Sequence, residues 1–238
     1  SLAPYASFNL AAHVGDDPAC VQENRRLLRQ ALRLPAEPVW LEQVHGVDAI
    51  DAAKDRSYRA DASYTNLPDV VCAVLTADCL PVLFCDSSGT RVAAAHAGWK
   101  GLLGGVLQNT VAALASAPIQ KTEVCPLSSV PRLQEAAEEL MAWLGPAIGP
   151  SAFAVGGNVR EAFLARLAGS EAAFVACERD TPDNQWHADL YALARLALAE
   201  AGVVRVYGGG LCTKSDNTRF YSYRREPVTG RMASLIWR

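Results

Sequence analysis

Histidine and cysteine are the residues of this sequence best suited to chemistry, and their placement is selective. The chain has four histidines, His13, His45, His96 and His187, and seven cysteines. His45 and His96 each lie close to a glycine at the point where an apolar run stops, and Cys79 lies at a third such break. Because folds present side chains to ligands at such breaks, these three residues are the first candidates for a functional site.

Two imidazoles and one thiolate form a ligand set that zinc accepts. Such a set leaves the fourth tetrahedral position of the ion for water or substrate, as in catalytic zinc sites. His45, Cys79 and His96 lie too far apart in the sequence for a finger-like structural site. Residue types alone leave plainer alternatives open, because a lone cysteine at a strand end is often a small buried hydrophobe, and a histidine near glycine often only satisfies a carbonyl group.

Charged residues near these positions extend the set of candidates. Asp78 adjoins Cys79 and could act as an acid, a base or a partner to a ligating imidazole, whereas the alternative is a turn-capping aspartate. The C-terminal segment carries several arginines whose guanidinium groups suit phosphate oxygens: Arg219, Arg224, Arg225, Arg231 and Arg238. A solvated hairpin face is the alternative for these arginines.

Helices and strands that alternate along the chain must position these residues. Apolar residues at helical spacing predict helices over Val21 to Leu34, Gly101 to Ala117, Leu133 to Leu144, Asn158 to Leu167 and Leu190 to Ala201. Asp189 is placed to cap the last of these helices, and Gly202 to end it. His96-Ala97-Gly98-Trp99 precedes the second helix, so a strand, a glycine turn and a helix form one unit.

Strands are predicted from short apolar runs and from alternation. Buried strands of one sheet are expected over Asp69 to Leu75, Leu80 to Cys85 and Arg91 to Ala95. The tail alternates over Arg219 to Arg225 and again over Arg231 to Trp237, which predicts a closing β-hairpin. The glycines at 101–105 and 208–210 match neither a Walker nor a Rossmann pattern.

Composition limits the classes of protein to consider. The 238 residues, 50% hydrophobic and 20% charged, are enough for one large core, so residues 1–238 are expected to form a single domain. The net charge of −3 argues against general nucleic-acid or acidic-membrane binding. The sequence has neither a membrane-spanning apolar run nor a signal-peptide layout at Ser1, and its odd number of cysteines suggests free thiols, so a cytoplasmic protein is expected.

Motifs in a fixed order run through nearly the whole chain. They occupy Pro38 to Gly46, Ala60 to Ser63, Leu75 to Val82, Ala95 to Gly101, Gly145 to Pro150 and Phe220 to Arg225. In residues and spacing they resemble the YfiH family of laccase-domain or polyphenol-oxidase-like proteins, more recently described as purine nucleoside phosphorylases.

This resemblance implies a fold, a cofactor and an activity. It implies an α+β domain in which mixed β-sheets pack as a sandwich flanked by helices, and it places the family's metal ligands on His45, Cys79 and His96. Zinc is the implied metal, with copper as the alternative. The implied chemistry is phosphorolysis of adenosine, inosine and methylthioadenosine, together with adenosine deamination. The expected partners are therefore small molecules, a purine nucleoside and phosphate, with no nucleic acid or membrane, and the chain is expected to be a monomer or a weak homodimer.

Within that chemistry, roles can be suggested for particular residues. Water activated by the metal would attack the purine in deamination, whereas phosphate held by Lys100 and the tail arginines, Arg224 among them, would attack the ribose. Lys100 lies at the start of a predicted helix whose amides also favour an anion. Asp78, beside the ligand Cys79, is the candidate for proton transfer.

Three differences from the family pattern bear on these expectations. The family's opening strand, with a Thr-Arg and a Gly-Gly segment, is not found before Ser1, so an arginine that would help to bind substrate is not expected here. Residues Gln120 to Ala136 look like an insertion. Lys100 stands where relatives usually carry arginine, which affects phosphate affinity and not metal binding. Ser151 stands where they often carry cysteine, which removes a possible extra thiol ligand.

Three other functions fit the same residues. A copper-dependent polyphenol oxidase could use a Cys-His₂ site, but the copper clusters of the known multicopper oxidases need far more imidazoles than the four of this chain. A cysteine hydrolase would use Cys79 as nucleophile and His96 as base. A metal-sensing or redox-sensing binding protein would use the same side chains without catalysis.

Overall fold

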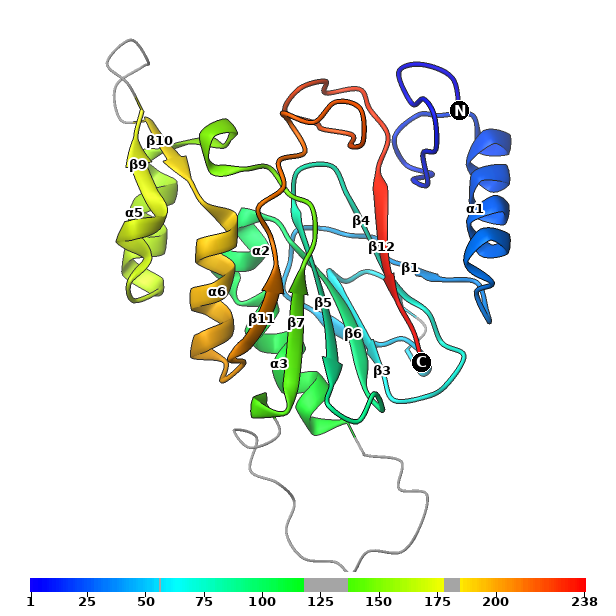
Figure 1. Cartoon of the computed structure of the whole chain (residues 1–238), viewed down its shortest axis with the longest axis horizontal. Helices are drawn as coiled ribbons and strands as arrows, with labels where there is room; N and C mark the ends of the chain where they lie inside the picture. Colours follow the sequence, from blue (N-terminus) through cyan, green and yellow to red (C-terminus); the bar gives the residue numbers. More distant parts are fainter. Residues whose placement is uncertain (56, 118–136, 178–184) are drawn as a thin grey trace, which may run out of the picture.

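The computed structural model describes residues 1–55, 57–117, 137–177 and 185–238, in which two β-sheets face each other and helices cover the outside (Figure 1). The helices are α1 (Pro18–Leu32), α2 (Trp99–Gly104), α3 (Val106–Ser116), α5 (Gly157–Arg166) and α6 (Leu190–Glu200), with 3-10 turns at Pro150–Ala152 and Ser170–Ala173. The expected insertion at Gln120 to Ala136 lies outside the described residues.

The larger sheet has six strands, in the order β11-β7-β5-β6-β3-β2. Their bounds are β2 (Ala49–Asp51), β3 (Ala62–Thr65), β5 (Leu80–Asp86), β6 (Val92–Ala97), β7 (Leu140–Leu144) and β11 (Arg205–Gly208). The central strands β5 and β6 pair antiparallel, with Pro81 opposite His96. Alternate residues of β5 face opposite ways, so that Val82 and Phe84 pack toward the helices and Leu83 toward the other sheet.

The second sheet has three strands, β1 (Val39–Trp40), β4 (Cys72–Thr76) and β12 (Met232–Ile236), in the order β1-β4-β12. Apolar residues of both sheets, including Val74 and Ala94, meet between them. The prediction that the segments around β4, β5 and β6 share one sheet is therefore wrong for β4. The chain passes from one sheet to the other between Thr76 and Leu80 and makes no hairpin there. Within this segment, Asp78 has a positive φ of 93°.

Helices α3 and α6 lie on the outer face of the six-stranded sheet and bury its main core. In Figure 1, α6 lies beside β11 on one side of the molecule and α1 lies on the opposite side, next to the three-stranded sheet. The helices predicted near α1, α5 and α6 are confirmed, and Asp189 caps α6 by accepting hydrogen bonds from the backbone of Tyr191 and Ala192. The helix predicted over 101–117 is two helices, α2 and α3, joined at Gly105.

A small third sheet, β8 (Ala154–Gly156), β10 (Gln185–Ala188) and β9 (Phe174–Ala176), lies beside α5. None of the helices in the described ranges is long and apolar enough to cross a membrane. The predicted α+β sandwich flanked by helices is confirmed as the fold class.

Two predicted elements are wrong. Of the helix predicted over Leu133 to Leu144, residues 133–136 lie outside the described residues. Leu140–Leu144 form strand β7, which pairs with β5 and β11 and buries alternate side chains, Leu140, Ala142 and Leu144, in the main core. The segment 219–225 is a loop, and β12 pairs with β4. In this loop, Arg225 points inward and donates to the carbonyl groups of Thr213, Lys214 and Phe220.

Candidate metal centre

Strand alternation brings three of the important side chains to one end of the six-stranded sheet. On β6, His96 is two residues from Ala94, so both side chains lie on the face that packs between the two sheets. Cys79, just before β5, is four residues from Leu83 and lies on the same face. Asp61 directly precedes β3, where its backbone carbonyl accepts a hydrogen bond from His96 N at 2.7 Å. These residues therefore share one face at the end of neighbouring strands.

His45 reaches the same place from the loop that follows β1, and Asp61 holds that loop. The fully buried Asp61 carboxylate accepts hydrogen bonds from the backbone N–H groups of Val44 (3.1 Å), His45 (2.9 Å) and Gly46 (2.6 Å). His45 has a φ of 59°, a left-handed conformation that costs energy for a residue other than glycine. Such strain is common where a side chain must be aimed at a functional site.

The side chains of His45, Cys79 and His96 converge in a geometry that fits a metal ion. One ligand atom from each lies within 4.8 Å of the others, and Cys79 Sγ is 3.9 Å from His45 Nε2. Tetrahedral zinc would place a sulfur and a nitrogen ligand about 3.5 Å apart. His96 Nδ1 donates to Asp61 Oδ1 at 2.8 Å, which leaves its Nε2 for the ion. Within the described ranges this is the only such group of histidine, cysteine and acidic residues.

The protonation of the metal-free site follows from these contacts. Burial raises the pKa of Cys79, but hydrogen bonds from His45 and His96 outweigh it and lower this pKa to about 6. Burial lowers the pKa of His96, but the bond to Asp61 and the contact with Cys79 raise it to about 9. Burial raises the pKa of Asp61, but the hydrogen bonds from His96 and Gly46 outweigh burial, so the pKa is lowered below its usual value. At neutral pH the site therefore holds a thiolate, an imidazolium and a carboxylate.

Glycines on α2 allow the helix to approach the ligands closely. A Cβ atom at Gly98, which precedes the helix, would lie 2.9 Å from Cys79 Sγ and 3.0 Å from His45 Cδ2. A Cβ at Gly101 would lie 2.8 Å from the carbonyl oxygen of Gly46. The glycines noted in the sequence therefore serve close packing against the His45 loop, and no phosphate-binding pattern is needed to explain them.

Asp78 lies beside Cys79, but its carboxylate does not touch a ligating imidazole. Its oxygens accept hydrogen bonds from Thr213 Oγ1 and from the backbone N–H of Arg224, each at 2.6 Å. Asp78 thus joins the break between the sheets to two segments of the C-terminal region. The role of imidazole partner that the sequence suggested for Asp78 is filled by Asp61, which lies between two alanines in the Ala60-Asp61-Ala62-Ser63 motif.

A cavity of about 500 Å³ opens above the ligands. Its apolar walls include Trp99, Phe153 and Tyr223, and both Lys100 and Arg224 line it. The exposed Lys100 lies over the Trp99 ring at 5.7 Å, and the exposed Arg224 stacks at 5.2 Å on Phe153. The predicted site residues are therefore brought together around one cavity.

The five tail arginines have different surroundings. Only Arg224 and Arg231 line this cavity. Arg219 pairs with Asp216, and Arg225 binds backbone carbonyl groups. The remaining one, Arg238, donates to the carbonyl groups of Asn66 and Thr90.

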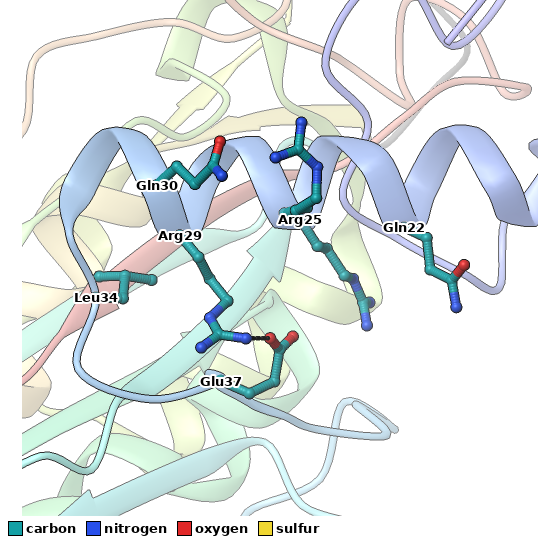
Figure 2. A pocket seen from close by; sticks show the side chains of 7 residues that line it. Gln22, Arg25, Arg29, Gln30, Leu34 and Glu37 are labelled. Atoms are coloured by element: carbon teal, nitrogen blue, oxygen red, sulfur yellow. Dashed lines mark hydrogen bonds and ion pairs between the residues drawn. The ribbon is translucent and has the colours of Figure 1, made fainter.

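A larger hollow, of about 630 Å³, lies along α1, away from the metal ligands (Figure 2). Its arginines already have partners within the chain. Arg25 donates to the Leu10 carbonyl group, Arg26 pairs with Glu23, and Arg29 points at Glu37, as the dashed line in Figure 2 marks. The hollow contains neither histidine nor cysteine, so the cavity above the triad is the candidate active site.

Comparison with known proteins shows the family of this chain. Residues 1–238 match the family described as multi-copper polyphenol oxidoreductase laccase. The chain is 52% identical over its whole length to the purine nucleoside phosphorylase YfiH of Escherichia coli (strain K12), of which it covers 88%. It is 53% identical to a purine nucleoside phosphorylase of Pseudomonas aeruginosa, again over the whole chain and 88% of the relative.

Solved structures agree in fold as well as in sequence. A Neisseria meningitidis protein superposes with a TM-score of 0.84 at 47% identity, covering 98% of this chain and 87% of that one. YlmD from Geobacillus stearothermophilus superposes with a TM-score of 0.80 at 32% identity, covering 99% of this chain and 86% of that one. The chain therefore belongs to the YfiH family, the family described as multi-copper polyphenol oxidoreductase laccase.

Proposed function

We propose that this protein is a zinc-dependent purine nucleoside phosphorylase whose metal is held by His45, Cys79 and His96. The observation that carries the proposal is the convergence of these three ligands beneath a cavity with aromatic walls and cationic side chains. Relatives at 52% and 53% identity carry the name purine nucleoside phosphorylase, which supports the same class of enzyme here.

The donor set favours zinc. A thiolate and two imidazoles, with Asp61 behind His96, are typical of a catalytic zinc site that keeps a fourth position open. Bound there, zinc would act as a Lewis acid toward a substrate oxygen or a water molecule. A single copper ion could use the same ligands, so the identity of the metal belongs to the proposal.

Phosphorolysis assigns a task to each wall of the cavity. An oxygen of phosphate forms a bond to the ribose C1′ while the bond from C1′ to the purine nitrogen breaks, and the purine takes that electron pair and a proton. Trp99, Phe153 and Tyr223 offer flat surfaces for the base. Lys100 and Arg224 supply positive charge for the phosphate dianion.

Asp78 is our candidate for supplying the proton, because its carboxyl group lines the cavity next to Cys79. Its hydrogen bonds with Thr213 and the Arg224 backbone also give it a positioning role. The variant Asp78→Asn separates the two, since it preserves size and one acceptor oxygen. A proton-transfer role requires a large fall in kcat that depends on pH, with the zinc content unchanged.

The same site is proposed to deaminate adenosine and to accept inosine and methylthioadenosine. In deamination, water adds to the purine carbon that carries the amino group, and ammonia leaves. This reaction needs no phosphate. The two activities can therefore be separated by omitting phosphate from the assay.

The test is analysis by mass spectrometry of the products from adenosine, incubated with pure protein with and without phosphate. The expected products are adenine and ribose 1-phosphate only when phosphate is present, and inosine in both cases. Cys79→Ala is the control, expected to be folded and inactive. If adenosine, inosine and methylthioadenosine all stay intact with the zinc-loaded protein, the proposed function is wrong.

A further inference from the structure

Arg231, at the start of β12, is held more firmly than the other cations of the cavity. Its backbone N–H donates to Asn9 Oδ1 at 2.9 Å, and its carbonyl group accepts from Leu10 N. Its side chain bends back so that Nη1 donates to the carbonyl groups of Thr229 (2.9 Å) and Gly230 (3.0 Å). Both ends of this half-buried residue are thus fixed before any ligand arrives.

The remaining edge of the guanidinium group is available. Among the described residues, Nε and Nη2 of Arg231 make no hydrogen bond, and the guanidinium group lies over the Tyr223 ring at 5.9 Å. These two N–H groups point the same way and form the fork that binds two oxygens of one anion. Arg231 lines the cavity together with the three metal ligands. Arg231 therefore belongs to the same cavity as the candidate metal ligands.

The neighbours of Arg231 agree with this placement. Burial lowers the pKa of its guanidinium group, while the negative charges of Cys79 and Asp78 raise it, so both lie close enough to interact with Arg231. Burial, and then the positive charge of Arg231, lowers the pKa of His13, which also lines the cavity. His13 is thus kept neutral and adds no second positive charge to Arg231.

The other cations are less suited to hold an anion rigidly. Arg224 is also held, by its bond to the Ala154 carbonyl group and by stacking on Phe153, but it is exposed, so solvent and salt screen its charge more than that of the half-buried Arg231. Lys100 is exposed and carries a flexible point charge. A long side chain that must be ordered on binding loses conformational entropy, whereas a fixed one has already lost it.

We infer that Arg231 is the main phosphate-binding residue of this site, gripping two phosphate oxygens through Nε and Nη2 while a third oxygen attacks the ribose C1′. The inference rests on the proposed phosphorolysis. Arg231 keeps its proton throughout, and the electron pair of the broken C1′–N bond goes to the purine. Lys100 and Arg224 then have a secondary, screening role.

The experiment uses the zinc-loaded full chain and its variants Arg231→Gln and Arg231→Lys, with Arg219→Gln as the matched control. Arg219 lies on the same C-terminal segment, is exposed and pairs with Asp216 outside the cavity. Two quantities are measured: the affinity for inorganic phosphate by calorimetry without nucleoside, and the separate KM values for phosphate and adenosine.

We expect Arg231→Gln to weaken phosphate binding and raise the phosphate KM by about ten- to a hundred-fold. The adenosine KM and the zinc content should stay within about two-fold of the wild type. If Arg231 were needed only for the fold, both would change along with phosphate binding. Arg231→Lys should recover part of the affinity because it keeps the charge without the fork. Arg219→Gln should match the wild type.

Unchanged phosphate affinity in both Arg231 variants would overturn the inference, as would a parallel loss of zinc and adenosine binding. The proposed function fails separately. If phosphate binds through Arg231 but no nucleoside is cleaved, phosphorolysis is wrong and the anion site stands. If adenosine is cleaved with an unchanged phosphate KM in Arg231→Gln, the anion site is wrong and phosphorolysis stands.

Discussion

Asp61 organises the metal centre at the level of single residues, although it is not itself one of the three candidate ligands. Its carboxylate joins the His45 loop to the His96 ring through four hydrogen bonds. Loss of such a partner typically lowers metal affinity by about ten- to a hundred-fold. The site thus depends on a residue that metal-ligand chemistry alone does not select.

Asp61→Asn is predicted to weaken zinc binding by about ten- to a hundred-fold, because the amide cannot accept all four hydrogen bonds. A titration with a competing chelator measures this affinity. Asp86→Asn is the matched control, since Asp86 is equally buried but pairs with Arg91 away from the metal. That variant should lose stability and keep its zinc affinity. Equal zinc affinities for Asp61→Asn and the wild type would contradict this role.

Zinc binding is predicted to release a proton from His96 at neutral pH. The His96 pKa of about 9 leaves its ring protonated at pH 7, whereas the Cys79 pKa of about 6 leaves a thiolate, and zinc needs both groups deprotonated. Zinc affinity should therefore rise about ten-fold per pH unit between these two values and level off above the higher one. Calorimetry in buffers of different ionisation enthalpy measures the proton, and a heat of binding independent of the buffer would argue against it.

Sequence and family resemblance together were sufficient to select His45, Cys79 and His96, because their residue types carry the chemistry. They were not sufficient to assign Asp61, or to single out Arg231 from the five tail arginines, because both roles depend on contacts with residues far away in the chain. Asp61 meets His96 only because β3 and β6 pair, and Arg231 reaches the cavity only because β12 joins β4. Such long-range pairing is not contained in local patterns.

At the scale of elements, the close approach of α2 to the His45 loop positions one ligand. Gly101→Ala would place a methyl group 2.8 Å from the Gly46 carbonyl oxygen, which cannot move without shifting the loop. The predicted result is weaker zinc binding, although alanine favours the helix by up to about 1 kcal/mol.

Gly104→Ala on the same helix is the control, since its methyl group would meet a side chain, Cγ1 of Val47 at 2.7 Å, and not the backbone of the His45 loop. Zinc affinity of both variants is measured by chelator competition. A Gly101→Ala protein that binds zinc as tightly as Gly104→Ala would show that the helix does not set the position of His45.

The wrongly predicted elements have a common physical cause. β7 is an apolar run short enough to suit either a helix or a strand, and its pairing with β5 and β11 decides between them. The segment 219–225 alternates like a strand, but it forms a loop. The inward-pointing side chain of Arg225 binds carbonyl groups of the loop instead of packing in a sheet. Long amphipathic helices such as α1 and α6 were predictable because their periodicity is local.

At the scale of the whole molecule, the candidate metal ligands come from both sheets and from the segment between them. His45 follows β1 of the three-stranded sheet, His96 lies on β6 of the six-stranded sheet, and Cys79 lies where the chain passes between them. An ion bound by all three would oppose separation of the sheets. The fold class was predictable from the resemblance, whereas the division of the strands between two sheets was not.

Removal of the metal is therefore predicted to lower the melting temperature. Zinc at a thousand times its Kd stabilises by about 4 kcal/mol, which corresponds to roughly 10 °C for a domain of this size. Cys79→Ala should melt like the chelated wild type and should not respond to zinc. Differential scanning calorimetry with and without chelator measures both, and an unchanged wild-type melting temperature on chelation would contradict a metal that joins the sheets.

One metal ion on His45, Cys79 and His96 is proposed to support phosphorolysis. The most direct test is to add zinc stepwise to metal-free protein while measuring adenine release from adenosine and phosphate. The rate should rise linearly and stop rising at about one equivalent per chain, with Cys79→Ala inactive throughout. Full activity in the metal-free protein, or activity that appears only with several equivalents of copper, would contradict this role of a single zinc ion.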